Sequence, residues 1–498
     1  MFTRPDDLFD RTQEWADLTE FVDPTRPGMR IGIVSGRRRH GKSFVLRRLV
    51  TGVEGLYHQA RELEKTQALA QFADDVAEYL ELDPGTLVFA DWEAAFRLVL
   101  GLPGRTSLRR PRRRPTTLVI DELPYLLVHS PEIPSVLQLL YDEAQNVKDM
   151  PATPVVLCGS ALSVMVELLS GNKPLRGRAQ LDLTMRSFDY RQARDYWQTT
   201  DPQVAFHLDA VLGGTPGYRA LVSSDPPSSL EGMYGWIAQE LLSPARSLFS
   251  ERAILLREDP RILDKAAYNS ILQAVAAGKR TTRAIGAAVG RDANLLRHPL
   301  GVLESAGFLL RVEDMLVKKR PTYQLADPII RFAEVVIEPQ RSLLEERDTA
   351  SAWKVSAPAY SSMILGPHFE HLARVWTGKY SGVRLGLPIG EVGPAVVNDA
   401  KGKAQHEIDV FAIERGRRVH DDNAPVLVLG EAKSTNRKRT VRDLARLDRI
   451  RATLVEAGTD AASAALVLFS RDGFDANLQS AAAARQDVHL VTLDDMYS

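Results

Sequence analysis

Cysteine is almost missing from this 498-residue chain, because Cys158 is the only one. A single thiol excludes an intramolecular disulfide and any metal site built from several cysteines. This usage is typical of proteins from a reducing compartment, so we expect a cytoplasmic location.

Long apolar runs and an excess of one charge are missing as well. No stretch approaches the roughly 20 apolar residues that a membrane-spanning helix needs, and the start, MFTRPDDLFDRTQEW, lacks the apolar core of a secretory signal. We therefore expect no membrane association. The 63 basic residues nearly balance 64 acidic ones, which argues against a wholly basic nucleic-acid binder but leaves room for local basic surfaces. The length predicts several domains.

A glycine-rich segment, GRRRHGKS at 36–43, lies between the apolar run RIGIVS and the helical pattern FVLRRLV. The order strand, loop, helix is the context in which such a loop binds phosphates. Its glycines let backbone N–H groups turn toward phosphate oxygens, its lysine reaches the terminal phosphates, and its serine ligates Mg²⁺. The sequence thus predicts an ATP site with Mg²⁺ at Gly36, Gly41, Lys42 and Ser43.

Two later apolar strands end in polar residues. TTLVIDEL at 116–123 presents Asp121, which can hold Mg²⁺ through water, and Glu122, which can act as the general base toward the attacking water. The alternative is a plain acidic cap at a strand end. PVVLCGS, which follows, ends in Ser160, similar to the polar residue near the γ-phosphate in AAA+ ATPases. Arg176 or Arg178 is either an arginine finger, in cis or toward a neighbouring subunit, or a solvated charge.

These motifs resemble, as a set, the prokaryotic ATPases of the STAND/AAA+ type. The residues that carry the resemblance are FDR at 9–11, GRRRHGKS, VIDEL, CGSALSVM, PLRGRA and GGTPGY at 213–218. The chain looks more closely like the archaeal-type ATPase family that often carries a nuclease-like carboxy-terminal domain. The resemblance implies a helical lid in which Gly214, Thr215 and Pro216 contact the nucleotide, and it raises the expectation of a homo-oligomer.

The middle of the chain shows helical patterns from 186 to 255, and residues 266–325 resemble a winged helix-turn-helix. The helix at 292–305 and a hairpin bearing Lys318, Lys319 and Arg320 would then contact DNA. The alternative is a packing or relay module, which Pro299 favours because it kinks or restarts that helix. Six arginines at 104–115 either bind phosphate backbone or form a solvated loop.

The carboxy-terminal region carries a set of charged residues on three elements. An amphipathic helix at 366–376 bears Glu370, the strand HEIDVFAI bears Asp409, and the strand PVLVLGEAK bears Glu431 and Lys433. Two residues apart, Glu431 and Lys433 share one face of their strand. Neighbouring carboxylates form a hard oxygen site for Mg²⁺, and the lysine can position or deprotonate water.

This order resembles the PD-(D/E)xK restriction-endonuclease-like superfamily, with Ile408 in place of the usual proline before Asp409. Glu370, Asp409 and Glu431 would then be metal ligands. A helix near 440–457 and strands at AALVLF and VHLVTL agree with that fold.

We expect an α/β multidomain protein whose P-loop ASCE/AAA+ core is followed by other modules. The expected domains are the ATPase core at 1–185, a helical lid at 186–258, a winged helix at 259–335, and a linker helix with a nuclease-like α/β domain at 336–498. The first functional hypothesis is an ATP-hydrolysing protein coupled to a DNA-binding, Mg²⁺-dependent nuclease domain, in genome defence or mobile-element control. The alternative is a STAND-type signalling or scaffold ATPase whose nuclease-like domain only binds nucleic acid or protein.

Overall fold

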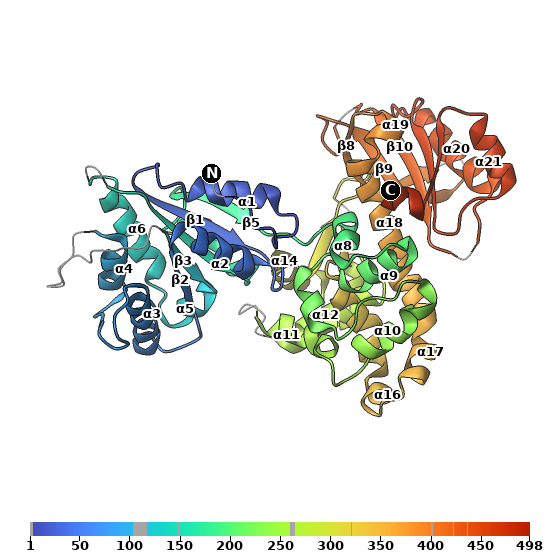
Figure 1. The fold of residues 1–498 in the computed structure, drawn as a ribbon. Coiled ribbons are helices and arrows are strands. Elements are labelled where there is room, and N and C mark those ends of the chain that lie inside the picture. The colour runs from blue at the N-terminus through green and yellow to red at the C-terminus, as the bar shows by residue number, and fades with distance from the viewer. Residues whose placement is uncertain are drawn as a thin grey trace. The chain divides into compact units, whose positions relative to one another are not determined.

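The computed structural model describes residues 3–102, 117–147, 150–258, 264–319, 321–399, 402–421, 423–435 and 437–498. The chain forms two compact units (Figure 1). The first is Met1–Ser187 with Thr215–Gly217 and Leu255–Leu263, and the second is Phe188–Gly214, Tyr218–Ile254 and Asp264–Ser498. The first unit's main segment ends next to the predicted boundary at 185, and the predicted division of the remainder into three domains stays a prediction. The described residues contain no helix that is both long and apolar enough to cross a membrane.

A five-stranded parallel sheet in the order β2-β3-β4-β1-β5 forms the first unit. Its strands β1 and β4 are buried along their whole lengths, which is why their sequences read as continuous apolar runs. The strands are β1 (Met29–Ser35), β2 (Leu56–Gln59), β3 (Leu118–Asp121), β4 (Thr153–Gly159) and β5 (Ala179–Thr184). The helices are α1 (Thr12–Phe21), α2 (Lys42–Val53), α3 (Lys65–Tyr79), α4 (Trp92–Leu100), α5 (Leu123–His129), α6 (Ile133–Ala144) and α7 (Leu162–Glu167).

Alternate residues of each strand point to two different cores. Ile31 and Ile33 of β1 pack into the core that contains α3, α4 and α6, whereas Val34 packs with α1 and α2 on the other face. Gly32 leaves space for Phe21 of α1, whose Cζ would lie 2.9 Å from an added Cβ. With both faces covered, the polar loops after the strands gather at the carboxyl edge of the sheet.

The second unit begins with helices and continues into a two-stranded antiparallel sheet, β6-β7. A 3₁₀ turn at Ala293–Leu296 ends where α14 begins, at Arg297, so the restart of the helix predicted around Pro299 is confirmed. The α-helices up to this sheet are α8 (Tyr190–Trp197), α9 (Pro202–Leu212), α10 (Met233–Glu240), α11 (Glu251–Glu258), α12 (Lys265–Ala276), α13 (Thr282–Val289) and α14 (Arg297–Ser305), and the strands are β6 (Leu309–Val312) and β7 (Thr322–Leu325).

A mixed five-stranded sheet in the order β12-β11-β10-β9-β8 follows. The predicted hairpin of Asp409 and Glu431 is confirmed, because β9 and β10 pair antiparallel, while β11 and β12 continue parallel to β10. The strands are β8 (Ile389–Asp399), β9 (Ala404–Glu414), β10 (Val426–Lys433), β11 (Ala465–Ser470) and β12 (Val488–Thr492). The remaining α-helices are α15 (Pro328–Phe332), α16 (Arg341–Glu345), α17 (Thr349–Ala359), α18 (Gly366–Val375), α19 (Gly382–Leu385), α20 (Val441–Glu456), α21 (Ala476–Ala483) and α22 (Leu493–Tyr497).

The loop between β6 and β7 is fastened to this mixed sheet. Met315 is buried in the core that the sheet forms with α20, and its backbone N–H donates to the carbonyl of Pro394 on β8 at 3.0 Å. His420 Nε2 donates to the carbonyl of Asp314 at 2.8 Å. The predicted wing is therefore packed against the sheet along part of its loop.

Candidate functional site

The glycine-rich loop joins the end of β1 to the start of α2 in the first unit. Gly41 has a φ of +89°, and Gly36 lies so close to β5 that an added Cβ would be 2.5 Å from the carbonyl oxygen of Met185. Lys42 is buried, and its Nζ donates to the carbonyl oxygens of Gly36 at 2.7 Å and Arg37 at 3.0 Å. The loop is thus curled around the ammonium group of Lys42.

The predicted lid element lies directly on this loop. The N–H of Gly217 donates to the carbonyl of Arg39 at 3.0 Å, and Pro216 lies 3.9 Å from the position of an added Cβ on Gly41. A Cβ on Gly217 would meet the Arg39 side chain at 2.6 Å, so glycine is needed for this approach. The structure therefore brings Pro216 next to the glycine-rich loop, and its contact with a nucleotide stays a prediction.

Asp121 ends β3 and is fully buried beside the first residues of α2. Its Oδ2 accepts from the Tyr57 hydroxyl at 2.5 Å, and its Oδ1 accepts from the N–H of Glu122 at 2.9 Å. Burial by itself raises the pKa of Asp121, but hydrogen bonds from Cys158, Ser43 and Tyr57 hold that pKa below its usual value. The two residues predicted at Mg²⁺, Ser43 and Asp121, are thus neighbours, and the carboxylate is ionised.

Glu122 and Ser160 also meet, across β3 and β4. Glu122 takes a left-handed conformation, with φ +56°, and its Oε2 accepts from the Ser160 hydroxyl at 2.8 Å and from the Ser160 N–H at 3.3 Å. Since β4 lies between β1 and β3, Ser160 stands between the phosphate loop and the acidic pair. Four side chains that sequence reasoning selected from three segments therefore converge at one edge of the sheet.

The structure does not bring the predicted arginine finger to this edge. Arg178 precedes β5, and its guanidinium pairs with the Asp142 carboxylate at 2.8 and 2.9 Å. Because β5 runs parallel to β1, Arg178 lies just before the amino end of β5, whereas the carboxyl end of β5 reaches the loop. At the usual rise per residue the two ends are roughly 20 Å apart. Arg176 donates to the carbonyl of Gly171. A role toward a neighbouring subunit stays a prediction, and the arginines of 104–115 lie outside the described residues.

Two residues that sequence reasoning left without a role, Arg11 and His40, hold the loop in place. The buried guanidinium of Arg11 donates to the carbonyls of His40 at 3.2 Å and Arg186 at 2.6 Å. His40 Nδ1 donates to the carbonyl of Met185 at 3.0 Å, and burial lowers the pKa of His40 to about 3. The signal for Arg11 was present in the FDR motif, which carried part of the resemblance.

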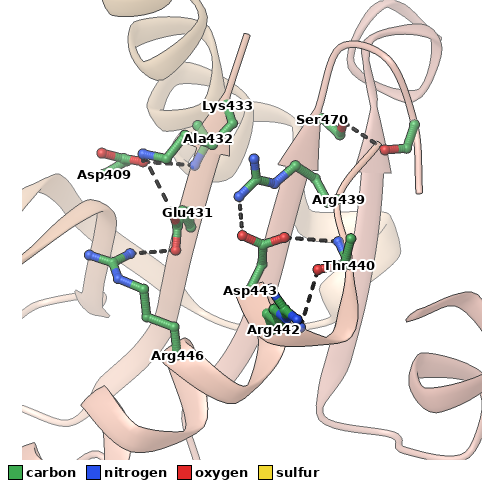
Figure 2. Close-up of polar contacts among 11 residues, drawn as sticks. Asp409, Glu431, Ala432, Lys433, Arg439, Thr440, Arg442, Asp443, Arg446 and Ser470 are labelled. Carbon is green, nitrogen blue, oxygen red and sulfur yellow. Dashed lines mark hydrogen bonds and ion pairs between the residues drawn. The ribbon is translucent and has the colours of Figure 1, made fainter. Parts of the chain in front are cut away.

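A second cluster occupies the mixed sheet of the second unit, where Figure 2 shows Asp409, Glu431 and Lys433 side by side. Asp409 Oδ2 accepts from Lys433 Nζ at 3.2 Å and from the N–H of Ala432 at 2.8 Å. Lys433 Nζ also lies 3.6 Å from Glu431 Oε1. Burial opposes the charge of Lys433, but the two carboxylates raise its pKa above the usual value. The predicted strand-to-strand arrangement is thus present.

Glu370, on α18, faces the same cluster. Burial raises the pKa of Glu370, and the charge of Asp409 raises it further, against the influence of Arg374 and Lys433. Arg374, one helical turn further on, donates to the carbonyl of Asp409 at 2.9 Å. Glu370 and Arg374 are four residues apart, so they lie on the same face of α18. This spacing is a sequence signal from which Arg374 could have been predicted.

Arg446, on α20, is a further member that the sequence did not reveal. Its guanidinium pairs with Glu431 Oε2 (Figure 2). It also donates to the carbonyl of Glu407 at 3.0 Å. Arg439, which follows β10, instead pairs with Asp443 in the first turn of α20. The sequence does not predict this pair, because only the packing of α20 against β10 brings Arg446 to Glu431.

Both sites offer the one or two protein oxygen ligands that Mg²⁺ usually takes. Within the described part of the chain there is no group of three or more His, Cys, Asp or Glu side chains placed to hold a metal. Mg²⁺ needs only one or two carboxylates, because water and phosphate oxygens complete its shell. Ser43 with Asp121, and Asp409 with Glu431, each supply that number of donors.

The proteins compared below share low sequence identity with this chain. No protein-family model matches it. A protein of Methanocaldococcus jannaschii described as uncharacterized, MJECL04, is 24% identical over 342 residues, which are 68% of this chain and 70% of that protein.

Two solved structures illustrate the likeness in fold. The Walker-type ATPase paby2304 of Pyrococcus abyssi has 18% identity and a TM-score of 0.48, covering 67% of this chain and 97% of its own. The ORC2 protein of Aeropyrum pernix, in complexes with ADPNP and ADP, has 15% identity and a TM-score of 0.41, covering 70% and 96%. Both identities are low, and the likeness is one of fold alone.

Proposed function

We propose that this protein binds ATP with Mg²⁺ and hydrolyses it at the carboxyl edge of the first sheet. The observation that carries the proposal is the convergence of Ser43, Asp121, Glu122 and Ser160 beside a loop curled around Lys42. These residues come from the ends of separate strands and have the chemistry that phosphoryl transfer requires. A plain acidic cap does not require the serine–glutamate pair or the ionised, buried Asp121.

Each residue has a definite task in this proposal. Lys42 and the loop N–H groups bind the phosphates, while Ser43 and Asp121 hold Mg²⁺, which neutralises charge on the phosphates. Glu122 accepts a proton from the attacking water. Ser160 restrains the Glu122 carboxylate through two hydrogen bonds, so movement of Ser160 controls when Glu122 is free to act.

Two variants separate binding from hydrolysis. We expect Lys42→Ala to abolish ATP binding, and Glu122→Gln to keep binding but to lower turnover at least 100-fold, the usual contribution of a general base. The measurements are nucleotide titration by fluorescence and phosphate release. Lys65→Ala, which removes an exposed lysine paired with Glu132 on the same unit, is the matched control and should leave both unchanged.

We further propose that the second unit is a Mg²⁺-dependent nuclease that acts on DNA, in genome defence or mobile-element control. The triangle of Asp409, Glu431 and Lys433 supports this, because a buried carboxylate pair with a shared lysine is costly for a domain that only binds. Lys433 positions a water molecule for attack on a phosphodiester, and its raised pKa keeps it cationic, which suits stabilisation of the developing charge.

Cleavage of plasmid and single-stranded DNA with Mg²⁺ and ATP tests this second role. Asp409→Asn and Lys433→Ala should each lower cleavage at least 100-fold, while Lys438→Ala, an exposed lysine five residues beyond the site lysine, should retain it. If the wild type cuts nothing but assembles with ATP in a manner lost in Lys42→Ala, the signalling or scaffold alternative holds instead.

A further inference from the structure

A cavity of about 560 Å³ lies at the second cluster, and two separate parts of the second unit line it. The mixed sheet and its helices contribute Glu370, Asp409 and Arg446. The segment that contains α13 and the β6-β7 sheet contributes Arg280, Thr322 and Gln324. Of the proposed cleavage residues, Asp409 lines the cavity, opposite the segment that contains β6 and β7, which we call the roof (residues 280–319 and 321–324).

The roof is ordered internally and is attached to the mixed sheet through the β6-β7 loop. The N–H of Tyr323 on β7 donates to the carbonyl of Arg280 at 2.7 Å, which fixes Arg280 beside the small sheet. Met315 anchors the β6-β7 loop in the core of the mixed sheet, and its N–H bonds to Pro394 at 3.0 Å. A packed core does not deform continuously, so the cavity keeps its size unless this anchor is released.

The charged side chains in the cavity suit a nucleic-acid backbone that binds together with a divalent cation. Arg280 is exposed and lies close enough to Glu370 and Arg374 for its charge to act on both. Five carboxylates and three guanidinium groups line the cavity. The excess of carboxylates means that a phosphate strand binds only with a divalent cation, after which the arginines can contact its other oxygens.

From this geometry we infer that the cavity takes a single strand of nucleic acid, with Arg280 of the roof contacting a phosphate next to the one that is cut. This rests on the proposed nuclease function and names its substrate. A cavity of this size holds a ligand of one or two nucleotides, whereas duplex DNA, whose major groove alone is about 12 Å wide, cannot enter beneath a fixed roof. Among the described residues that line the cavity none is aromatic, so none can stack on a base. The strand is then held through its backbone, without sequence preference.

Binding of labelled 20-nucleotide DNA and RNA single strands, a blunt duplex, and a duplex with a single-stranded flap tests the inference. The full-length protein is titrated by fluorescence anisotropy with Ca²⁺ in place of Mg²⁺, at several KCl concentrations. We expect either single strand and the flap to bind at least tenfold more tightly than the blunt duplex. Binding should disappear in EDTA.

Arg280→Ala should weaken single-strand binding about fivefold to tenfold and lower the slope of log affinity against log [KCl] by about 0.7, the value for one phosphate contact. Lys279→Ala, an exposed cation one residue away that does not line the cavity, is the matched control and should leave the slope unchanged.

Equal or tighter binding of the blunt duplex, or identical behaviour of the two variants, would overturn the inference. Strand-selective binding without cleavage in Mg²⁺ would support it and contradict only the nuclease function on which it rests. Cleavage of the blunt duplex without strand-selective binding would support the nuclease and overturn the inference.

Discussion

Gly36 occupies a position that no side chain fits, because the backbone carbonyl of Met185 lies where its Cβ would be. That carbonyl cannot move freely, since the N–H of the same residue donates to Ser35 at 2.7 Å and His40 donates to its oxygen. The contact joins β5 to the phosphate loop. A change at Gly36 is therefore expected to alter the loop that holds Lys42, besides lowering stability.

Gly36→Ala should lower the free energy of unfolding by about 1–3 kcal/mol, from the clash and the positive φ, and should weaken ATP binding. The matched control is Gly52→Ala, inside α2, where an added Cβ meets nothing within 4 Å. That substitution should be neutral or stabilising by about 0.5–1 kcal/mol. Urea denaturation measures the free energy of unfolding of both variants, and nucleotide titration measures their ATP binding. Equal changes in the Gly36→Ala and Gly52→Ala variants would contradict the steric argument.

At the scale of elements, the β6-β7 loop is attached to the mixed sheet by the buried Met315 side chain together with two hydrogen bonds. Gly393 on β8 is packed so closely against Met315 that an added Cβ would lie 2.9 Å from its sulfur. The close fit explains why this loop lies on the sheet, whereas the sequence left both DNA contact and a packing role open for this segment.

Met315→Ala should cost about 2–5 kcal/mol through the cavity it leaves and should increase hydrogen exchange in residues 309–325. Leu310→Ala, on the exposed side of β6, is the control and should change stability by less than about 0.5 kcal/mol. Hydrogen–deuterium exchange mass spectrometry measures the exchange in both variants. Unchanged exchange in Met315→Ala would show that the loop is held by other contacts.

At the scale of the whole molecule, the chain holds two histidines of the two units in their neutral form. Burial lowers the pKa values of His40 and His207 to about 3 each, from a usual 6.5. The unfolded chain therefore takes up these protons first as the pH falls. The associated stability is complete above about pH 7 and is lost progressively between pH 6.5 and about 3, at about 1.4 kcal/mol per pH unit for each histidine.

The free energy of unfolding should thus decline steeply from pH 7 to pH 5, as measured by urea denaturation at several pH values. His207→Gln should make the decline shallower, whatever its effect at pH 7, because it removes one buried titrating group. His298→Gln, at an exposed position, should leave the slope unchanged. A wild-type stability that does not depend on pH in this range would contradict the prediction.

Local patterns in the sequence were sufficient for the elements that carry the sites. Strand, loop and helix around Lys42, the strand that ends in Asp121, and the hairpin of Asp409 and Glu431 all follow from apolar periodicity and glycine placement, which act over a few residues. The pairing of Ser43 with Asp121 also follows, because parallel strands end at the same edge of a sheet.

Contacts between distant segments were decided by the tertiary structure alone. Glu122 turns into a left-handed conformation to reach Ser160, Arg446 arrives from α20 to pair with Glu431, and Arg178 is placed at the far end of its strand. Cysteine scarcity and the motif residues were readable from the sequence because they need only composition and spacing. The roof of the cavity and the partners of each site depend on the packing of residues separated by tens of positions, which local periodicity does not encode.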